Sequence, residues 1–174
     1  MTEVVDLDRA RHEAAVRRGY RNWRSRFHEE FGEATRTGDL SDATLRFLSQ
    51  GSEEAAFYLY DLIMCVLQLG SGFEIRALSP EDRLRVMDRY LFLLDRLRFE
   101  VMRRLGWVDA FPGEDDSLVE LVRRYETLAP SLQAAVPELS RDHPDYETYR
   151  TVSAFEKESF IRKMIPAALE AFSG

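Results

Sequence analysis

The sequence predicts an all-α protein, because signals that begin and end helices recur along the chain while strand signals do not. Serine and aspartate residues stand where helices would begin, and glycines stand where several would end. Between these signals, apolar residues recur every three or four positions, and no run alternates apolar and polar residues as a half-buried strand does. We therefore expect a single-domain helical bundle of roughly five to seven helices.

The predicted domain spans residues 1–174, without an internal repeat or a low-complexity segment. A chain of this length can bury one sizeable core. We expect flexibility in residues 1–8. The weakest internal boundary lies near residues 109–116, in a loop that contains proline, glycine and several acidic residues.

The first predicted helix begins at Asp6 or Asp8 and runs to about Thr35. When successive residues are placed about 100° apart around the helix axis, six apolar residues fall into one narrow stripe. They are Val16, Tyr20, Trp23, Phe27, Phe31 and Ala34. Arg17, Arg21 and Arg24 lie beside the stripe and Arg18 lies opposite it, so the aromatic and basic residues occupy different sides of the helix.

This arrangement separates two interpretations of the segment. A platform for single-stranded nucleic acid needs exposed aromatic rings beside cations. Burying four rings removes on the order of 600 Å² from water, an upper bound of roughly 15 kcal/mol. We therefore interpret the stripe as core and assign Arg17, Arg21 and Arg24 as candidate partner-binding residues. The same arginines also fit a solvated face that pairs with the acidic segment 27–75, and the sequence leaves this alternative open.

Serines mark the starts of the next three helices. Ser41 caps a short helix that stops at Gly51, and Ser52 begins a longer one that ends near Leu69. Ser79, with Pro80 at the first helical position, begins a helix that runs through Leu105. That last helix is apolar on more than one side, so it lies at the centre of the bundle or is partly covered by another subunit. The second possibility predicts a homodimer.

The remaining helices are interrupted by prolines. Ser117 and Glu120 form a capping-box pattern that opens a helix to about Leu128. Pro130 and Pro137 interrupt the following segment. In the last helical region, Pro166 is expected to end or kink the helix near Ile165.

Composition indicates a cytoplasmic globular protein without a membrane span. The chain is 45% hydrophobic and 32% charged, with a net charge of −7, which argues against polyanion binding over the whole surface. Residues 1–7 carry no secretory signal pattern, and the most apolar stretch, residues 55–69, is too short to cross a bilayer. A single cysteine, Cys65, fits a reducing compartment.

No catalytic, metal-binding or cofactor motif appears, and we assign no catalytic residue, metal or cofactor. The three histidines are not spaced as metal ligands. Two pairs of carboxylates lie seven residues apart, Glu54 with Asp61 and Asp88 with Asp95, and they resemble a magnesium-binding cluster only weakly. Asp61 stands out because it lies in an otherwise apolar run, where a carboxylate needs a partner or a helix edge.

The preferred functional prediction is a non-enzymatic helical interaction protein, such as an adaptor or regulator, that binds a protein partner or a second copy of itself. The first alternative is a nucleic-acid-associated protein that uses the arginine-rich side of residues 17–24. The second alternative is a small metal-dependent hydrolase that uses Asp61 with other carboxylates.

Overall fold

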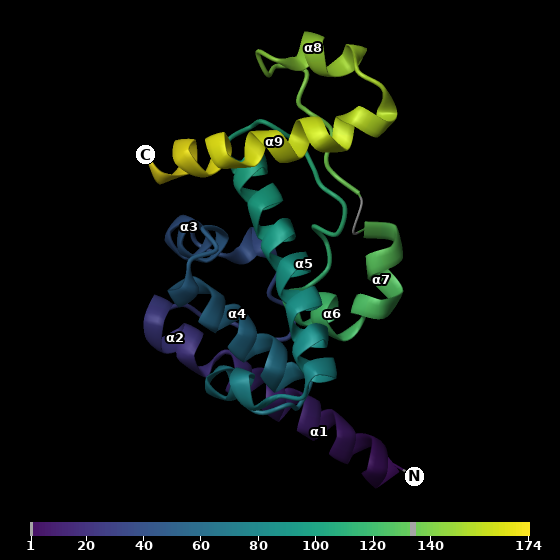
Figure 1. Cartoon of the computed structure of the whole chain (residues 1–174). Coiled ribbons are helices and arrows are strands. Elements are labelled where there is room, and N and C mark those ends of the chain that lie inside the picture. The colour runs from purple at the N-terminus through teal and green to yellow at the C-terminus, as the bar shows by residue number, and fades with distance from the viewer. Residues whose placement is uncertain (1, 133–134) are drawn as a thin grey trace.

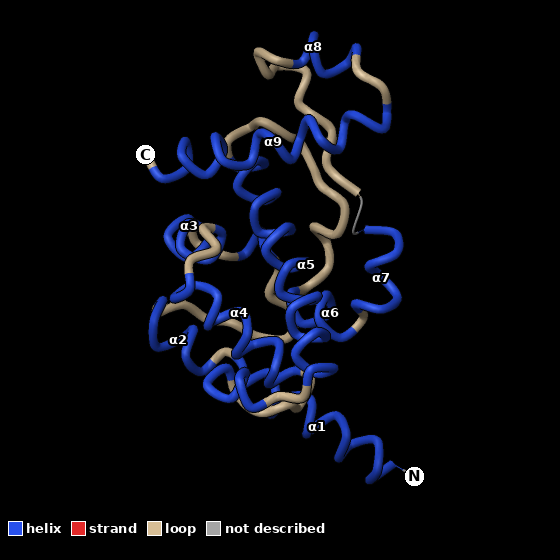
Figure 2. The backbone as a smooth tube through the Cα atoms, viewed as in Figure 1, coloured by secondary structure: helices blue, strands red, loops and turns tan. Residues whose placement is uncertain are grey.

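The computed structural model describes residues 2–132 and 135–174, and it confirms the all-α fold class. This described part contains nine α-helices, two short 3-10 helices and no β-strand, and one isolated bridge pairs Val108 with Leu139 (Figures 1 and 2). The elements are α1 (Thr2–Gly19), α2 (Arg21–Phe27), η1 (Thr37–Asp39), α3 (Asp42–Ser49), α4 (Glu53–Val66), η2 (Gly72–Ala77), α5 (Pro80–Arg104), α6 (Leu118–Arg123), α7 (Tyr125–Leu132), α8 (Tyr146–Thr151) and α9 (Ala154–Ser173). Long loops join α5 to α6 and α7 to α8 (Figure 2).

The described helices outnumber the predicted five to seven because three predicted helical regions are interrupted. Tyr20 separates α1 from α2, and Arg124 separates α6 from α7. Ser153 starts α9 anew after α8, because its side chain accepts a hydrogen bond from the Glu156 N–H. The caps predicted at Ser41, Ser52, Ser79 and Ser117 are confirmed, since each of these side chains accepts a hydrogen bond from the backbone N–H three residues later.

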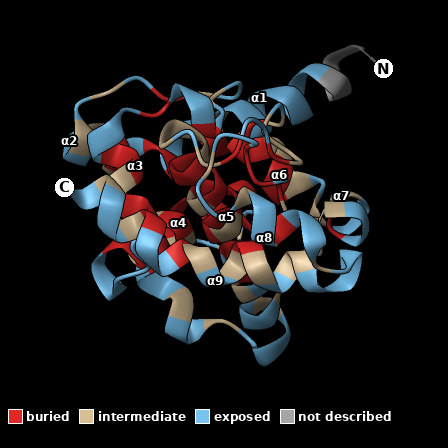
Figure 3. Ribbon diagram, turned by 90° about the horizontal axis from the view of Figure 1, so that it is seen from above, coloured by how far each residue is buried: buried red, intermediate tan, exposed pale blue. Residues whose placement is uncertain are grey.

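Helix α5 lies at the centre of the described structure, which is the first of the two alternatives that the sequence left open. It contacts α3, α4, α6 and α9, and Figure 3 shows the buried residues gathered around it. Leu93, Leu97 and Phe99 are fully buried, whereas Leu84 and Leu91 are 64% and 58% exposed. The apolar residues of α5 are therefore mostly covered by other parts of the chain. Only a small strip that contains Leu84 and Leu91 is exposed.

Helix α4 packs against α1 through an unusually close approach at Gly19. A Cβ atom at this position would lie 3.0 Å from the Leu62 Cδ1 atom and 3.3 Å from the Cys65 Cβ atom. A larger residue would push the helices apart, so Gly19 sets the distance between α1 and α4. This contact brings the end of α1 beside Asp61.

The first predicted helix is wrong beyond Phe27. Helix α2 ends there because His28 adopts a left-handed conformation with φ of 57°. The following loop returns Phe31 to the core, where its ring stacks on Tyr20 with centroids 5.3 Å apart, while Ala34 is exposed. The apolar stripe that was predicted along one helix is thus formed by α1, α2 and the loop that contains Phe31.

Glu29 explains why the chain leaves the helix. Its carboxylate accepts hydrogen bonds from the Ser41 N–H at 3.0 Å and the Ser41 hydroxyl at 2.8 Å, and from the Thr44 hydroxyl. These contacts place a negative charge at the N-terminus of α3, where the helix dipole favours it. Burial acts to raise the pKa of Glu29, but the hydrogen bonds from Thr44 and Ser41 outweigh it and hold that pKa below its ordinary value.

Pro166 was expected to end or kink the last helix, and the first of these two outcomes is wrong, since α9 continues to Ser173. Proline removes one backbone hydrogen bond, but packing on both sides of it compensates. Ile161, Ile165 and Ala168 are buried, and α9 contacts both α3 and α5. The helix lies across one end of α5 (Figure 1).

Candidate functional site

Three arginines at the junction of α1 and α2 form an exposed basic surface, which we call the arginine edge (Arg17, Arg18 and Arg21). All three side chains are exposed, and none forms an ion pair with a described residue. Two of the predicted binding residues, Arg17 and Arg21, therefore present uncommitted guanidinium groups. The third, Arg24, is half-buried and donates to the Arg17 and Phe31 carbonyls at 3.4 and 3.2 Å.

The aromatic residues of the same segment face the core, as the sequence analysis concluded. Tyr20, Trp23 and Phe31 are buried and Phe27 is half-buried. The Trp23 Nε1–H donates to the Tyr58 carbonyl at 2.8 Å. These rings are therefore not available for base stacking.

A pocket of about 520 Å³ adjoins the arginine edge and brings together residues that the sequence analysis considered separately. It lies between the end of α1, the start of α2, α4 and the segment that leads into η2. Arg18 and Arg21 line it on one side, and Asp61 and Cys65 lie on another. Arg17 and Arg24 do not line it. A guanidinium rim above a mixed polar and apolar pocket suits a partner group that carries a carboxylate.

Asp61 lies at the floor of this pocket and is only 1% exposed. Its carboxylate accepts hydrogen bonds from the Asn22 Nδ2 at 2.9 Å and from the Gly72 N–H at 3.0 Å. A Cβ atom at Gly72 would lie 3.1 Å from the Asp61 nitrogen, so η2 packs directly on α4 here. Asp61 therefore joins α2, α4 and η2, which accounts for a carboxylate in an apolar run.

The neighbouring groups offer neither a metal site nor a nucleophile. Within the described ranges, no group of three or more His, Cys, Asp and Glu side chains is arranged to hold a metal ion. Burial and the nearby Asp61 charge raise the pKa of the Cys65 thiol to about 11. That thiol stays protonated near neutral pH, whereas the thiolate is the reactive form.

Sequence reasoning missed Phe73, which lines the same pocket. This side chain is 78% exposed, and its ring packs on Phe57 with centroids 4.7 Å apart. Phe73 lies between the predicted helix that ends near Leu69 and the one that begins at Ser79, in a segment to which we assigned no helix. An aromatic residue next to the Gly70-Ser71-Gly72 turn, outside any apolar periodicity, is the signal that identifies it.

In comparisons with protein families, curated proteins and solved structures, none matches this chain. Of the helices that the structure describes, none combines the length and the apolar character that crossing a bilayer requires.

We expect Asp61→Asn to lower the free energy of unfolding by about 1–3 kcal/mol. The amide keeps one acceptor oxygen, and its NH₂ group then faces either Asn22 or the Gly72 N–H, which are both donors. Urea denaturation measures the loss, and Asp88→Asn, at an exposed position on α5, is the matched control. If millimolar Mg²⁺ or Mn²⁺ stabilises the wild type and not Asp61→Asn, the carboxylate is a metal ligand and the hydrolase alternative takes precedence.

Proposed function

We propose that this protein is a non-enzymatic interaction protein, an adaptor or regulator, that binds an acidic segment of a protein partner at the arginine edge and the adjoining pocket. It would act in the cytoplasm as a single all-helical domain spanning residues 1–174. The observation that carries the proposal is that three exposed arginines remain without an ion pair among the described residues of an acidic chain.

The chemistry of the surface favours a carboxylate-bearing peptide. A guanidinium group donates two parallel hydrogen bonds to one carboxylate, which gives direction as well as attraction. The exposed ring of Phe73 offers an apolar contact next to these charges. A partner segment with acidic residues around one apolar residue would use both features.

Several features make nucleic acid the second candidate. Only one strongly exposed aromatic ring, Phe73, lines this pocket, whereas single-strand binding sites use several rings in succession. The net charge of −7 repels an extended polyanion beyond the arginine edge. Self-association stays a prediction, and the exposed Leu84 and Leu91 of α5 mark the face where it would occur.

Charge reversal tests the proposal. We expect Arg17→Glu with Arg21→Glu to abolish binding of a fluorescent acidic peptide with one central leucine, measured by anisotropy. The melting temperature should stay nearly unchanged, because exposed ion pairs contribute only about 0–1 kcal/mol and these arginines have none to lose. Wild-type binding should weaken as salt is added.

The matched control is Arg9→Glu with Arg124→Glu, which changes the net charge by the same amount at exposed positions away from the pocket. Equal losses in both double variants would mean that net charge alone attracts the peptide, and the proposed site would be wrong. If a fluorescent oligothymidylate binds while the peptide does not, and Arg17→Glu with Arg21→Glu abolishes that binding, the nucleic-acid alternative is correct.

A further inference from the structure

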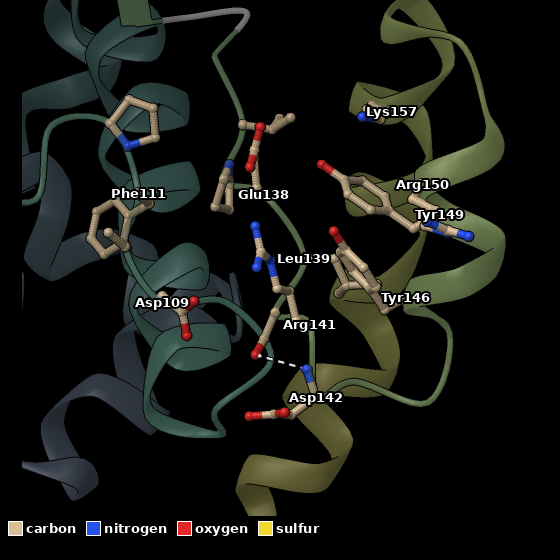
Figure 4. A pocket seen from close by; sticks show the side chains of 15 residues that line it. Asp109, Phe111, Glu138, Leu139, Arg141, Asp142, Tyr146, Tyr149, Arg150 and Lys157 are labelled. Atoms are coloured by element: carbon tan, nitrogen blue, oxygen red, sulfur yellow. Dashed lines mark hydrogen bonds between the residues drawn. The ribbon is translucent and has the colours of Figure 1, made fainter.

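A cavity of about 710 Å³ lies between residues 109–112, residues 136–142, α8 and the start of α9. Both signs of charge occur along its walls, and Figure 4 shows Glu138 near the same end as Lys157 and Tyr149. Because the two signs are mixed, this cavity favours no class of ligand. The N-terminal half of α1 differs, because its unpaired charge is separated from the arginine edge along one helix.

The first turns of α1 extend away from the rest of the described structure, as Figures 1 and 3 both show. Every side chain from residue 6 to residue 13 is exposed, and burial begins at Ala15. Most helices in proteins are stabilised by packing one face against another element. Residues 6–13 have no buried face, so a contact with a second molecule would supply one.

Four residues of α1 recur at intervals of three or four positions and therefore share one side of the helix. They are Leu7, Ala10, Ala14 and Arg18. At about 100° per residue, this side lies opposite the one on which Gly19 contacts α4. Leu7 is 56% exposed, and the two alanines are small enough for a second helix to approach closely.

Opposite charges lie at the two ends of this side. Asp6 at one end, and Arg17 and Arg18 at the other, are exposed, and none of the three forms an ion pair with a described residue. Asp6 and Arg18 are twelve residues apart, about 18 Å along a helix, so they cannot pair within one chain. Each end is open to a group of opposite charge from another molecule.

The charged residues between the two ends pair with one another. The Arg9 Nε atom lies 3.0 Å from the Glu13 carboxylate, and the Arg11 guanidinium group lies 3.9 Å from the Asp8 carboxylate. These pairs compensate their own charges. The uncompensated groups of this segment are therefore at its ends.

A second copy of the chain matches this side when the two α1 helices run antiparallel. If Ala10 of one copy lies opposite Ala14 of the other, Asp6 comes level with Arg18. A two-fold axis repeats each contact, so both ends of both helices meet an opposite charge at once. A parallel arrangement would place like charges together.

The exposed strip of α5 is the other apolar surface that a second copy could use, but its charges are less favourable. Asp88 is exposed between Leu84 and Leu91 on the same side of α5. An antiparallel pair that places Leu84 against Leu91 brings Asp88 of both copies near the two-fold axis. Two carboxylates would then lie side by side, whereas the contact through α1 pairs opposite charges.

We propose that the α1 helices of two copies pair antiparallel, with Asp6 of one copy beside Arg18 of the other and Leu7 against the stem of Arg17. The pairing covers part of the arginine edge, so it would compete with an acidic partner. This regulatory consequence rests on the proposed function, whereas the pairing itself does not.

Sedimentation of the full chain tests the pairing. We expect the wild type to dimerise weakly, at about 100 µM and low salt, because a contact of a few helical turns is smaller than a standard interface. Added salt should dissociate the dimer. Asp6→Arg and Arg18→Asp should each raise the dimer Kd at least roughly tenfold, since like charges then meet at both ends.

A mixture of the two variants gives the decisive result. Asp6→Arg and Arg18→Asp are complementary, so an equimolar mixture should form a heterodimer, and a chain with both substitutions should dimerise like the wild type. Net charge does not explain such a recovery, because the wild-type charge is −7 and both variants remain acidic. Failure of the mixture to associate would overturn the proposal.

Two controls place the contact. Asp88→Arg makes the same change in net charge at an exposed position, and Leu91→Asp disrupts the strip of α5; both should leave the dimer intact. A dimer that is lost in Leu91→Asp and kept in Asp6→Arg would refute the pairing through α1. So would a wild type that stays monomeric at about 500 µM, where even a weak contact is populated.

The peptide experiment separates this inference from the proposed function, because it is done at protein concentrations below the dimer Kd. A monomer that binds the acidic peptide would overturn the pairing and keep the proposed function. A dimer with the expected variant pattern and no affinity for the peptide would support the pairing and contradict the proposed function.

Discussion

Replacing Trp23 with alanine is expected to lower the free energy of unfolding by about 3–5 kcal/mol, the range for large aromatic truncations in protein cores. The side chain is fully buried, and it contacts Tyr20 and Phe31 at centroid distances of 5.1 and 5.4 Å. Its removal leaves a cavity at the junction of α2 and α4 and removes the second hydrogen bond that the Trp23 indole N–H gives to the Tyr58 carbonyl. Both effects destabilise the fold in the same direction.

The comparison with Phe27 sharpens this prediction. Phe27 is half-buried and packs at the edge of the same cluster, with its ring 5.6 Å from that of Phe47. Phe27→Ala should therefore also destabilise the protein, but by less than Trp23→Ala. Chemical denaturation followed by circular dichroism measures both losses against the wild type.

A different outcome would change the interpretation of the whole N-terminal segment. If Trp23→Ala folded as stably as the wild type but no longer bound the acidic peptide or an oligonucleotide, the ring would be exposed and used for binding. The stacking platform that the buried cluster excludes would then be correct. Testing the stability and the ligand binding of the same variant distinguishes the two cases.

Helix starts were predictable because their causes are local. At Ser41, Ser52, Ser79 and Ser117, one side chain accepts a hydrogen bond from a backbone N–H three residues away. Helix ends were not, because distant contacts decide them. The end of α2 depends on the contact between Glu29 and Ser41 at the N-terminus of α3. The residues close to Phe27 in the sequence give no sign of this contact.

The candidate site was predictable in its parts and not in its assembly. Periodicity placed Arg17 and Arg21 away from the aromatic stripe, and an isolated charge in an apolar run singled out Asp61. The meeting of Arg21 and Asp61 in one pocket depends on the close approach of α1 to α4 at Gly19. From sequence alone, a glycine inside a helix indicates only a position that lowers the stability of the helix. Its role as the contact point between two helices appears only when the neighbouring helix is known.

The sequence pattern did not indicate that α5 carries buried arginines. Arg89 and Arg96 are only 4% and 0% exposed. Arg89 donates to the Val122 carbonyl at 3.1 Å, at the end of α6. Half-exposed Arg98 donates to the Ser49 carbonyl at 2.9 Å, at the end of α3. Helix α5 therefore uses its arginines to satisfy carbonyls at the ends of its neighbours, which would otherwise lack partners.

Arg96→Met is expected to lower the free energy of unfolding by about 3–5 kcal/mol, as for the loss of one member of a buried charged network. The guanidinium group of Arg96 donates to the carbonyls of Pro112, Leu132 and Ala135. Methionine fills much of the space against Phe92 and Phe99 but offers no donor, so three carbonyls lose a partner. Asp95 keeps its two hydrogen bonds from Arg162, which limits the loss on that side.

Two further substitutions separate geometry from charge. Arg96→Lys keeps the charge, but one ammonium group cannot match the planar fork that serves two loops at once, so we expect an intermediate loss. Arg98→Met removes a donor to Ser49 at a half-exposed position, where water replaces the guanidinium group, and it should cost only about 1 kcal/mol.

Urea denaturation of the three variants gives this order directly. A stability of Arg96→Met within about 1 kcal/mol of the wild type would mean that water reaches all three carbonyls. The guanidinium group of Arg96 would then add little to the stability of the core.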